Sequence, residues 1–178
     1  MIQTIAKRIV VMCLLLISSA AFAQSSMPST EEINELVSKA DEKVTAMEGA
    51  IKTAKPLMDR IDPAATKKDL EAASVAHLTI KAIKSKQADA YLLVSLLSIL
   101  DDLDSDAATT SVELLANQSA SLANGERPDP RIMGVLSLLS NARIGCRDIS
   151  ELVLHVTLRY VENEEMLLSK LLSTKGKK

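Results

Sequence analysis

The chain has 178 residues, 47% of them hydrophobic and 25% charged, and its formal net charge at neutral pH is −2. This length suits one domain with a sizeable core. Because binding to nucleic acid needs a broad basic face, we expect no nucleic-acid partner. With no Trp, two Tyr and one Phe, the chain also lacks the aromatic platforms on which bases or sugars stack.

The amino terminus has the order of a cleaved secretory signal peptide. Lys7 and Arg8 precede an apolar run, which ends in small residues at Ala23. The run is shorter than the roughly 20 residues that a membrane-spanning helix needs. We therefore predict that residues 1–23 are removed and that 24–178 form one helical domain. The protein would be exported, to the periplasm or the extracellular space, with no stable membrane insertion after cleavage.

Cleavage changes the charge and the cysteine content of the chain. Without Lys7 and Arg8, 19 of the 21 basic residues remain against 23 acidic ones, a formal charge of about −4. Cys13 leaves with the signal, so Cys146 has no partner within the mature chain. We interpret Cys146 as a half-buried, small apolar residue at a helix junction, with a disulfide between two chains as the alternative. The basic tail at 175–178 is expected to fray.

Apolar spacing and capping signals predict an all-α fold with no strand. The expected helices cover about residues 30–55, 63–84, 86–103, 107–123, 130–144 and 149–172. They would form an irregular bundle of about six helices. The helix at 86–103 would lie in its centre, because it is apolar on nearly all sides. "SLLS" recurs at 95–98 and 137–140, so a short array of helical hairpins is the alternative fold.

The helix at 30–55 has the clearest pattern. Ser29 and Glu32 form a capping box at its start, and Pro56 is expected to stop or kink it. Its apolar residues recur every three or four positions and form a narrow seam, which consists of Ile33, Val37, Ala40, Val44, Met47, Ile51 and Ala54. We interpret the seam as packed inside the protein's own bundle. Self-association through this helix, or through Cys146, is the alternative.

Both histidines fall on polar helix edges. His77 shares its edge with lysines, and His155 lies between Glu151 and Arg159 on a charged stripe. We interpret both imidazoles as solvated. Neither has the Glu three residues earlier that di-iron bundles use.

Residues 102–113 read "DLDSDAATTSVE", and their spacing resembles the calcium-binding loop of the EF-hand family. Such a loop lies between two helices and places oxygen ligands at alternate positions, with a closing glutamate. The resemblance implies side-chain ligands at Asp102, Asp104, Asp106, Thr110 and Glu113, with the backbone carbonyl of Ala108.

The stretch also departs from that family. Ala107 stands where the loop has glycine, and left-handed geometry costs alanine about 1–2 kcal/mol. Acidic residues at 104–106 could instead cap a helix that begins at Ala107. A second capping box, Thr110 with Glu113, would start that helix at Ser111 and leave the loop free.

Two hypotheses for function follow. The first is an exported, non-enzymatic binding or interaction protein that presents a helical groove or the seam of 30–55 to a protein partner. The second is a calcium-binding helical protein that uses 102–113. The sequence carries no recognised catalytic or cofactor-binding motif, which argues against an enzyme and against any cofactor other than calcium. A catalytic site of scattered residues is a third alternative.

Overall fold

The computed structural model describes residues 27–86 and 89–175. The predicted signal peptide, its cleavage site and the end of the basic tail lie outside the described residues. Within the described part of the chain there is no strand, and no helix is both long and apolar enough to cross a membrane.

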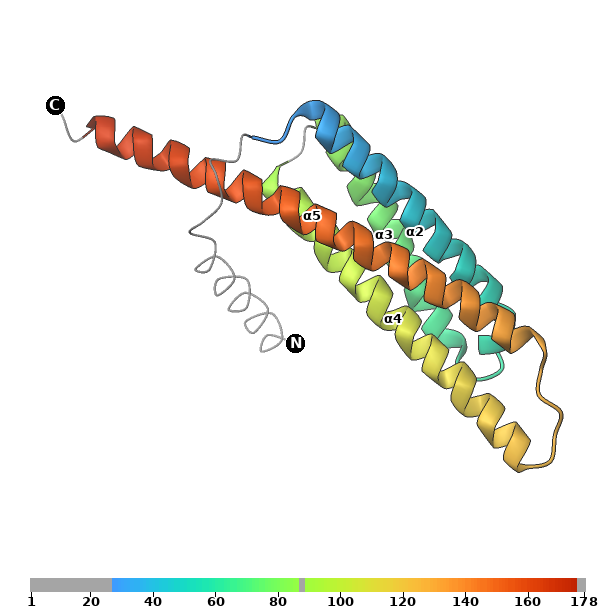
Figure 1. Cartoon of the computed structure of the whole chain (residues 1–178). Coiled ribbons are helices and arrows are strands. Elements are labelled where there is room, and N and C mark those ends of the chain that lie inside the picture. The colour runs from blue at the N-terminus through green and yellow to red at the C-terminus, as the bar shows by residue number, and fades with distance from the viewer. Residues whose placement is uncertain (1–26, 87–88, 176–178) are drawn as a thin grey trace.

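Four long antiparallel helices make up the described fold (Figure 1). They are α2 (Thr30–Met58), α3 (Pro63–Lys86), α4 (Ala90–Ala123) and α5 (Arg131–Lys175). Each helix packs against the next one in sequence, and α5 returns to pack against α2. This closes the ring, so the fold is a four-helix bundle and not an open array of hairpins. The carboxyl-terminal part of α5 extends beyond the bundle (Figure 1).

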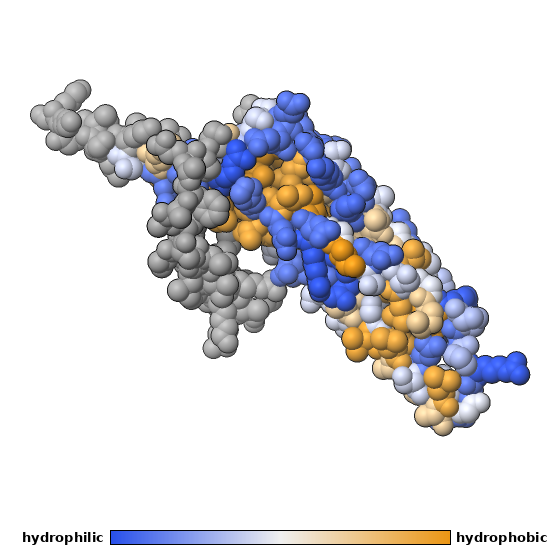
Figure 2. All heavy atoms as spheres, viewed as in Figure 1, coloured by the Kyte–Doolittle hydropathy of each residue, from blue (hydrophilic) through white to orange (hydrophobic). Residues whose placement is uncertain are grey.

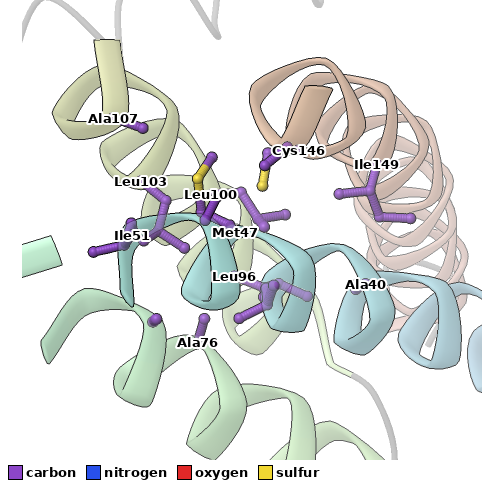
Figure 3. Close-up of a cluster of buried hydrophobic side chains, with 14 of the residues drawn as sticks. Ala40, Met47, Ile51, Ala76, Leu96, Leu100, Leu103, Ala107, Cys146 and Ile149 are labelled. Atoms are coloured by element: carbon purple, nitrogen blue, oxygen red, sulfur yellow. The ribbon is translucent and has the colours of Figure 1, made fainter. Parts of the chain in front are cut away.

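The core is built from one apolar seam on each helix. Buried positions recur every three or four residues, the spacing that keeps one face of a helix against its partners. The seam of α4 consists of Leu93, Leu96, Leu100, Leu103, Ala107, Thr110 and Leu114. The α2 seam predicted from sequence is buried along its whole length, from Ile33 to Ala54. Figure 3 shows Met47 of α2, Leu100 of α4 and Cys146 of α5 in one cluster.

The prediction of six helices is wrong, because two expected breaks do not occur. Residues 90–103 of one expected helix and 107–123 of the next belong to the single helix α4, which begins at Ala90. Leu103 and Ala107 are both completely buried, so the apolar seam runs straight through the acidic stretch. The aspartates lie beside the seam and bond to neighbouring helices, so they do not interrupt it.

The second missing break is at Gly145, which lies inside α5. The seam of α5 passes it without a change of spacing, through Ala142, Cys146 and Ile149. Since these contacts hold both sides of the glycine in one helix, its weak helix propensity of about 1 kcal/mol is overridden.

Two further expectations need correction. Pro56 does not stop α2, which continues to Met58. The proline is exposed, so water can bond the carbonyl that lacks an N–H partner. Nor does 86–103 lie in the centre, because each of the four helices has an exposed side. Tyr91, in the first turn of α4, is 79% exposed.

Candidate functional site

A groove runs between α2 and α5 on the outside of the bundle. It consists of two adjoining hollows of about 510 and about 500 Å³, which share Thr53 and Leu138. Half of its lining residues are small: Ala46, Gly49, Ala50 and Thr53 on α2, and Gly134, Ala142 and Gly145 on α5. Residues 46–56 and 134–145 span about three helical turns. We refer to this feature as the α2/α5 groove.

Two of its glycines leave space that the protein itself does not fill. A Cβ atom added at Gly49 or Gly134 would meet no other atom within 4 Å. A glycine inside a helix costs about 1 kcal/mol relative to alanine. Nothing packed against Gly49 in the described bundle accounts for that cost. At Gly145, an added Cβ would lie 3.1 Å from Cδ of Lys43.

The groove is apolar along its length and basic at its ends. Leu138, near the middle, is 48% exposed. Lys43 lines one hollow and Arg131 the other, and these are the only charged residues in the described lining. Lys43 bonds to Glu42, and Arg131 bonds to Asp129. The groove can therefore take an apolar helix face whose margins carry acidic residues.

The acidic stretch at 102–113 is not a loop. All of its residues are helical within α4, so the predicted EF-hand-like conformation is wrong. Successive side chains of a helix point about 100° apart. The five expected ligands therefore cannot converge on one cation while 102–113 stays helical. The physical reason is the continuous seam through Leu103, Ala107 and Thr110, which favours helix over a loop.

The side chain of Asp104 faces α5. Its carboxylate accepts hydrogen bonds from Nε of Arg143 at 2.9 Å and from Nε of Arg147 at 3.0 Å. Asp104 and Arg143 are both largely shielded from solvent, with side chains 16% and 24% exposed. This cluster connects α4 to α5 beside Cys146.

Three other predicted ligands face α3. Asp106 pairs with Lys68 at 2.8 Å, and the Thr110 hydroxyl donates to Oδ2 of Asp69 at 3.1 Å. Oε2 of Glu113 is buried and has no hydrogen-bond partner among the described atoms. Asp102 is exposed on the same helix. The predicted set is thus divided between two helix interfaces.

Asp69 is a buried carboxyl that sequence reasoning missed. It is 2% exposed, and Thr66, one turn earlier, is completely buried with its hydroxyl unpaired in the described structure. The pKa of Asp69 is raised to about 6, chiefly by burial and less by the charges of Asp106 and Glu113, while the hydrogen bond from Thr110 and the charge of Lys68 oppose the shift. The spacing of the buried residues Ala73, Ala76 and Ile80 places Asp69 on the same face of α3. Sequence analysis did not expect it to be buried because its side chain is polar.

No metal site is evident in the described residues. No group of three or more His, Cys, Asp and Glu side chains is placed to hold an ion in that part of the chain. Calcium binding by Asp102, Asp104, Asp106, Thr110 and Glu113 stays a prediction that would require α4 to open at 102–113.

His77 is better connected than its helical spacing suggests. Nδ1 lies 2.9 Å from Oδ1 of Asp41, and Nε2 lies 3.6 Å from Oε2 of Glu48. Both carboxylates come from α2, so the imidazole links α2 to α3. His77 is therefore not simply solvated, since its side chain is 31% exposed and lies beside two carboxylates. Sequence analysis missed these partners because they come from another helix. His155 is exposed, as expected.

Cys146 is completely buried and is a free thiol. Burial raises the pKa of the thiol to about 11, and Asp104 adds to this effect. Cys146 packs as a small apolar residue, as expected, but it is completely and not half buried, and it lies within a helix and not at a junction. A disulfide between chains would require this part of the bundle to open.

Comparison with known proteins adds no family assignment. No protein-family model, no curated protein and no solved structure matches this chain.

Proposed function

We propose that this protein is an exported, non-enzymatic helical bundle that binds one amphipathic helix of a protein partner in the α2/α5 groove. The single observation that carries the proposal is the open space above Gly49 and Gly134, which both line the apolar groove. A docked helix would fill that space and bring its backbone close to both helices.

The dimensions of the groove support a helix as the occupant. The lining at 46–56 and 134–145 extends for about three turns, or roughly 16 Å. Leu138 would insert between side chains of the docked helix. The two adjoining hollows would each receive one apolar side chain or a pair of them.

The charges of the groove support an acidic margin on that helix. Lys43 and Arg131 are the charged lining residues, and both are basic. Acidic residues at the ends of a docked helix would compete with Glu42 and Asp129 for these cations. The contribution of such rim charges is mainly to orientation and association rate.

Export rests on the predicted signal peptide at 1–23. We propose that the protein acts outside the cytoplasm after cleavage. Mass spectrometry of the protein recovered from its source should give a chain that begins at Gln24. An intact amino terminus would contradict export through this signal.

The groove can be tested with synthetic helical peptides and two matched leucine variants. Gly49→Leu fills the groove, and Ala116→Leu adds the same side chain at an exposed position on α4. The probe is a peptide with an Ala/Leu face and glutamates at its margins, measured by fluorescence anisotropy. We expect binding to the wild type and to Ala116→Leu, and at least about tenfold weaker binding to Gly49→Leu, equivalent to 1.4 kcal/mol.

Three results would contradict the proposal. Equal binding to both leucine variants would place the contact elsewhere. Equal binding of a lysine-flanked peptide would remove the argument from charge. Sedimentation that reveals a dimer of the wild type, lost in Gly49→Leu, would assign the groove to a second copy of this chain.

A further inference from the structure

A second hollow lies at the end of the bundle where α2 ends and α4 leads into the 124–130 loop. Its volume is about 280 Å³, and it shares only Leu57 with the α2/α5 groove. Its polar lining includes Arg60, Arg127, Asn117, Gln118 and Ser121. We refer to it as the end hollow. Such a volume suits a small molecule and not a protein segment.

Two arginines, Arg60 and Arg127, line the end hollow, and both are exposed. Within residues 27–86 and 89–175, Arg60 and Arg127 form no ion pair, whereas each of the other four arginines does. A guanidinium group carries a fixed charge and five N–H donors in a planar fork. Two such groups in one hollow form a donor set that matches an oxyanion.

The acidic residues of the hollow do not cancel these charges. Asp129 is engaged by Arg131, whose Nε and Nη2 donate to the carboxylate at 3.0 and 2.6 Å. These bonds, with a smaller contribution from the charge of Arg60, hold the pKa of Asp129 down at about 2, so Asp129 is ionised at neutral pH and is bonded mainly to Arg131. Glu126 is the remaining acid of the lining, and it is exposed. The lining itself holds two arginines and two acids, and Arg131, which lies just outside it and pairs with Asp129, brings the balance to one positive charge.

The other lining groups extend the donor set. The side-chain amides of Asn117 and Gln118 and the hydroxyl of Ser121 can each donate to an anion. Leu57, Ile61 and Leu114 line the same hollow with apolar surface. The combination fits a ligand with an anionic head and a short apolar body.

We propose that the end hollow binds a small organic anion, whose carboxylate or phosphate group is held by Arg60 and Arg127. This site uses different cations from those that line the α2/α5 groove, although the two share Leu57 and are connected by the Arg131–Asp129 pair.

The test is calorimetric titration of the full mature chain with butyrate and, separately, with inorganic phosphate. We expect saturable binding of at least one of them. Arg60→Gln and Arg127→Gln should each weaken it at least about tenfold. Lys67→Gln is the matched control, because Lys67 is a cation on α3 with a side chain 78% exposed. The probe that binds more tightly shows whether the head group of the natural ligand is a carboxylate or a phosphate.

The location of the bound anion can be checked by NMR. The side-chain amide signals of Asn117 and Gln118 should shift on addition of the anion, with the same midpoint as the heat. The proposal is overturned if neither probe binds more tightly than about 10 mM. It is also overturned if Lys67→Gln weakens binding as much as the two arginine variants, or if butylammonium binds as well as butyrate.

Discussion

Two parts of the core follow the same spacing but differ in chemistry. The apolar cluster around Met47, Leu100 and Cys146 fills its seam positions with side chains that need no partner (Figure 3). Between α3 and α4, Thr66, Asp69 and Thr110 occupy equivalent seam positions, and all three are buried. We call this second region, together with the flanking Glu113, the polar layer. The spacing of three or four residues therefore decides which positions are buried. The chemistry of each side chain decides how much free energy its burial costs.

The polar layer is also incompletely satisfied. Asp69 and Thr110 bond to each other across the α3–α4 interface. In an antiparallel pair with that register, Thr66 lies level with Glu113. These are the two residues with a buried polar atom that lacks a hydrogen-bond partner among the described atoms. Unpaired buried groups of this kind cost about 1–3 kcal/mol each unless water reaches them.

Apolar residues are also exposed on the surface, at two places along the bundle (Figure 2). Figure 2 shows apolar residues on this face near the start of α2 and again where α4 ends and α5 begins. Exposed apolar side chains in the second region include Leu115, Leu122 and Met133, at 47%, 52% and 64% exposure.

The largest effect should come from breaking the apolar cluster. Leu100 is completely buried, so Leu100→Ala removes its side chain and leaves a cavity. We expect a loss of about 2–5 kcal/mol in the free energy of unfolding, measured by urea denaturation. The matched change Leu122→Ala removes a leucine that is 52% exposed and should cost far less. Equal losses would mean that the cluster does not hold the bundle together.

The polar layer should reveal itself through pH. The pKa of Asp69 is about 6 in the folded protein, compared with 3.8 for a free side chain. Burial therefore disfavours its charged form, and its contribution to stability is complete below pH 3.8 and lost as pH rises through about 6. Two pKa units correspond to about 3 kcal/mol.

The measurement is urea unfolding of the wild type and Asp69→Asn at about pH 4 and pH 7. The difference between the two proteins should shift by up to about 3 kcal/mol in favour of the variant at the higher pH. Asp106, Glu113 and Lys68 face Asp69 in both proteins, so their own titration largely cancels. Glu71→Gln, at an exposed position of the same helix, is the control. A difference that does not change with pH would contradict a raised pKa.

Local sequence signals correctly predicted the starts of α2, α3 and α5, whereas the starts expected at 107 or 111 and at 149 do not occur. The Ser29–Glu32 box forms both of its hydrogen bonds, at 3.1 and 2.7 Å. Asp62 and Asp129 each accept from the second following backbone N–H, as the Asp-Pro pairs indicated. All seven residues of the predicted α2 seam are buried, although Leu36, Ala50, Leu57 and Met58 are buried as well and were not predicted. In all these cases the partners lie within a few residues of each other.

The errors arose where the partners are distant. The acidic stretch resembles a break when read alone, but Asp104 pairs with Arg143, 39 residues away, and Asp106 pairs with Lys68, 38 residues away. His77 gains Asp41 across 36 residues. The acidic residues that resemble a turn when the sequence is read alone are therefore stabilised within a continuous helix by partners on other helices.

The ion pairs beside the two regions offer a finer comparison. Asp104→Asn weakens contacts with two arginines at a largely shielded site, so we expect a loss of about 1–2 kcal/mol. Asp106→Asn weakens a contact with Lys68, whose side chain is 71% exposed, and should cost less than about 1 kcal/mol. Urea denaturation at low salt measures both variants. A reversed order would show that the α3–α4 contact is the stronger of the two.

The smallest effect tests a position outside both regions. Gly49 faces open space, so Gly49→Ala adds a Cβ that meets nothing and should raise stability by about 0.5–1 kcal/mol. Gly145→Ala should gain less, because Lys43 must move away from the new Cβ. Thermal unfolding of both variants measures this difference. A loss of stability in Gly49→Ala would mean that another group fills the space above it, and the argument for a helix docked in the α2/α5 groove would then lose its main observation.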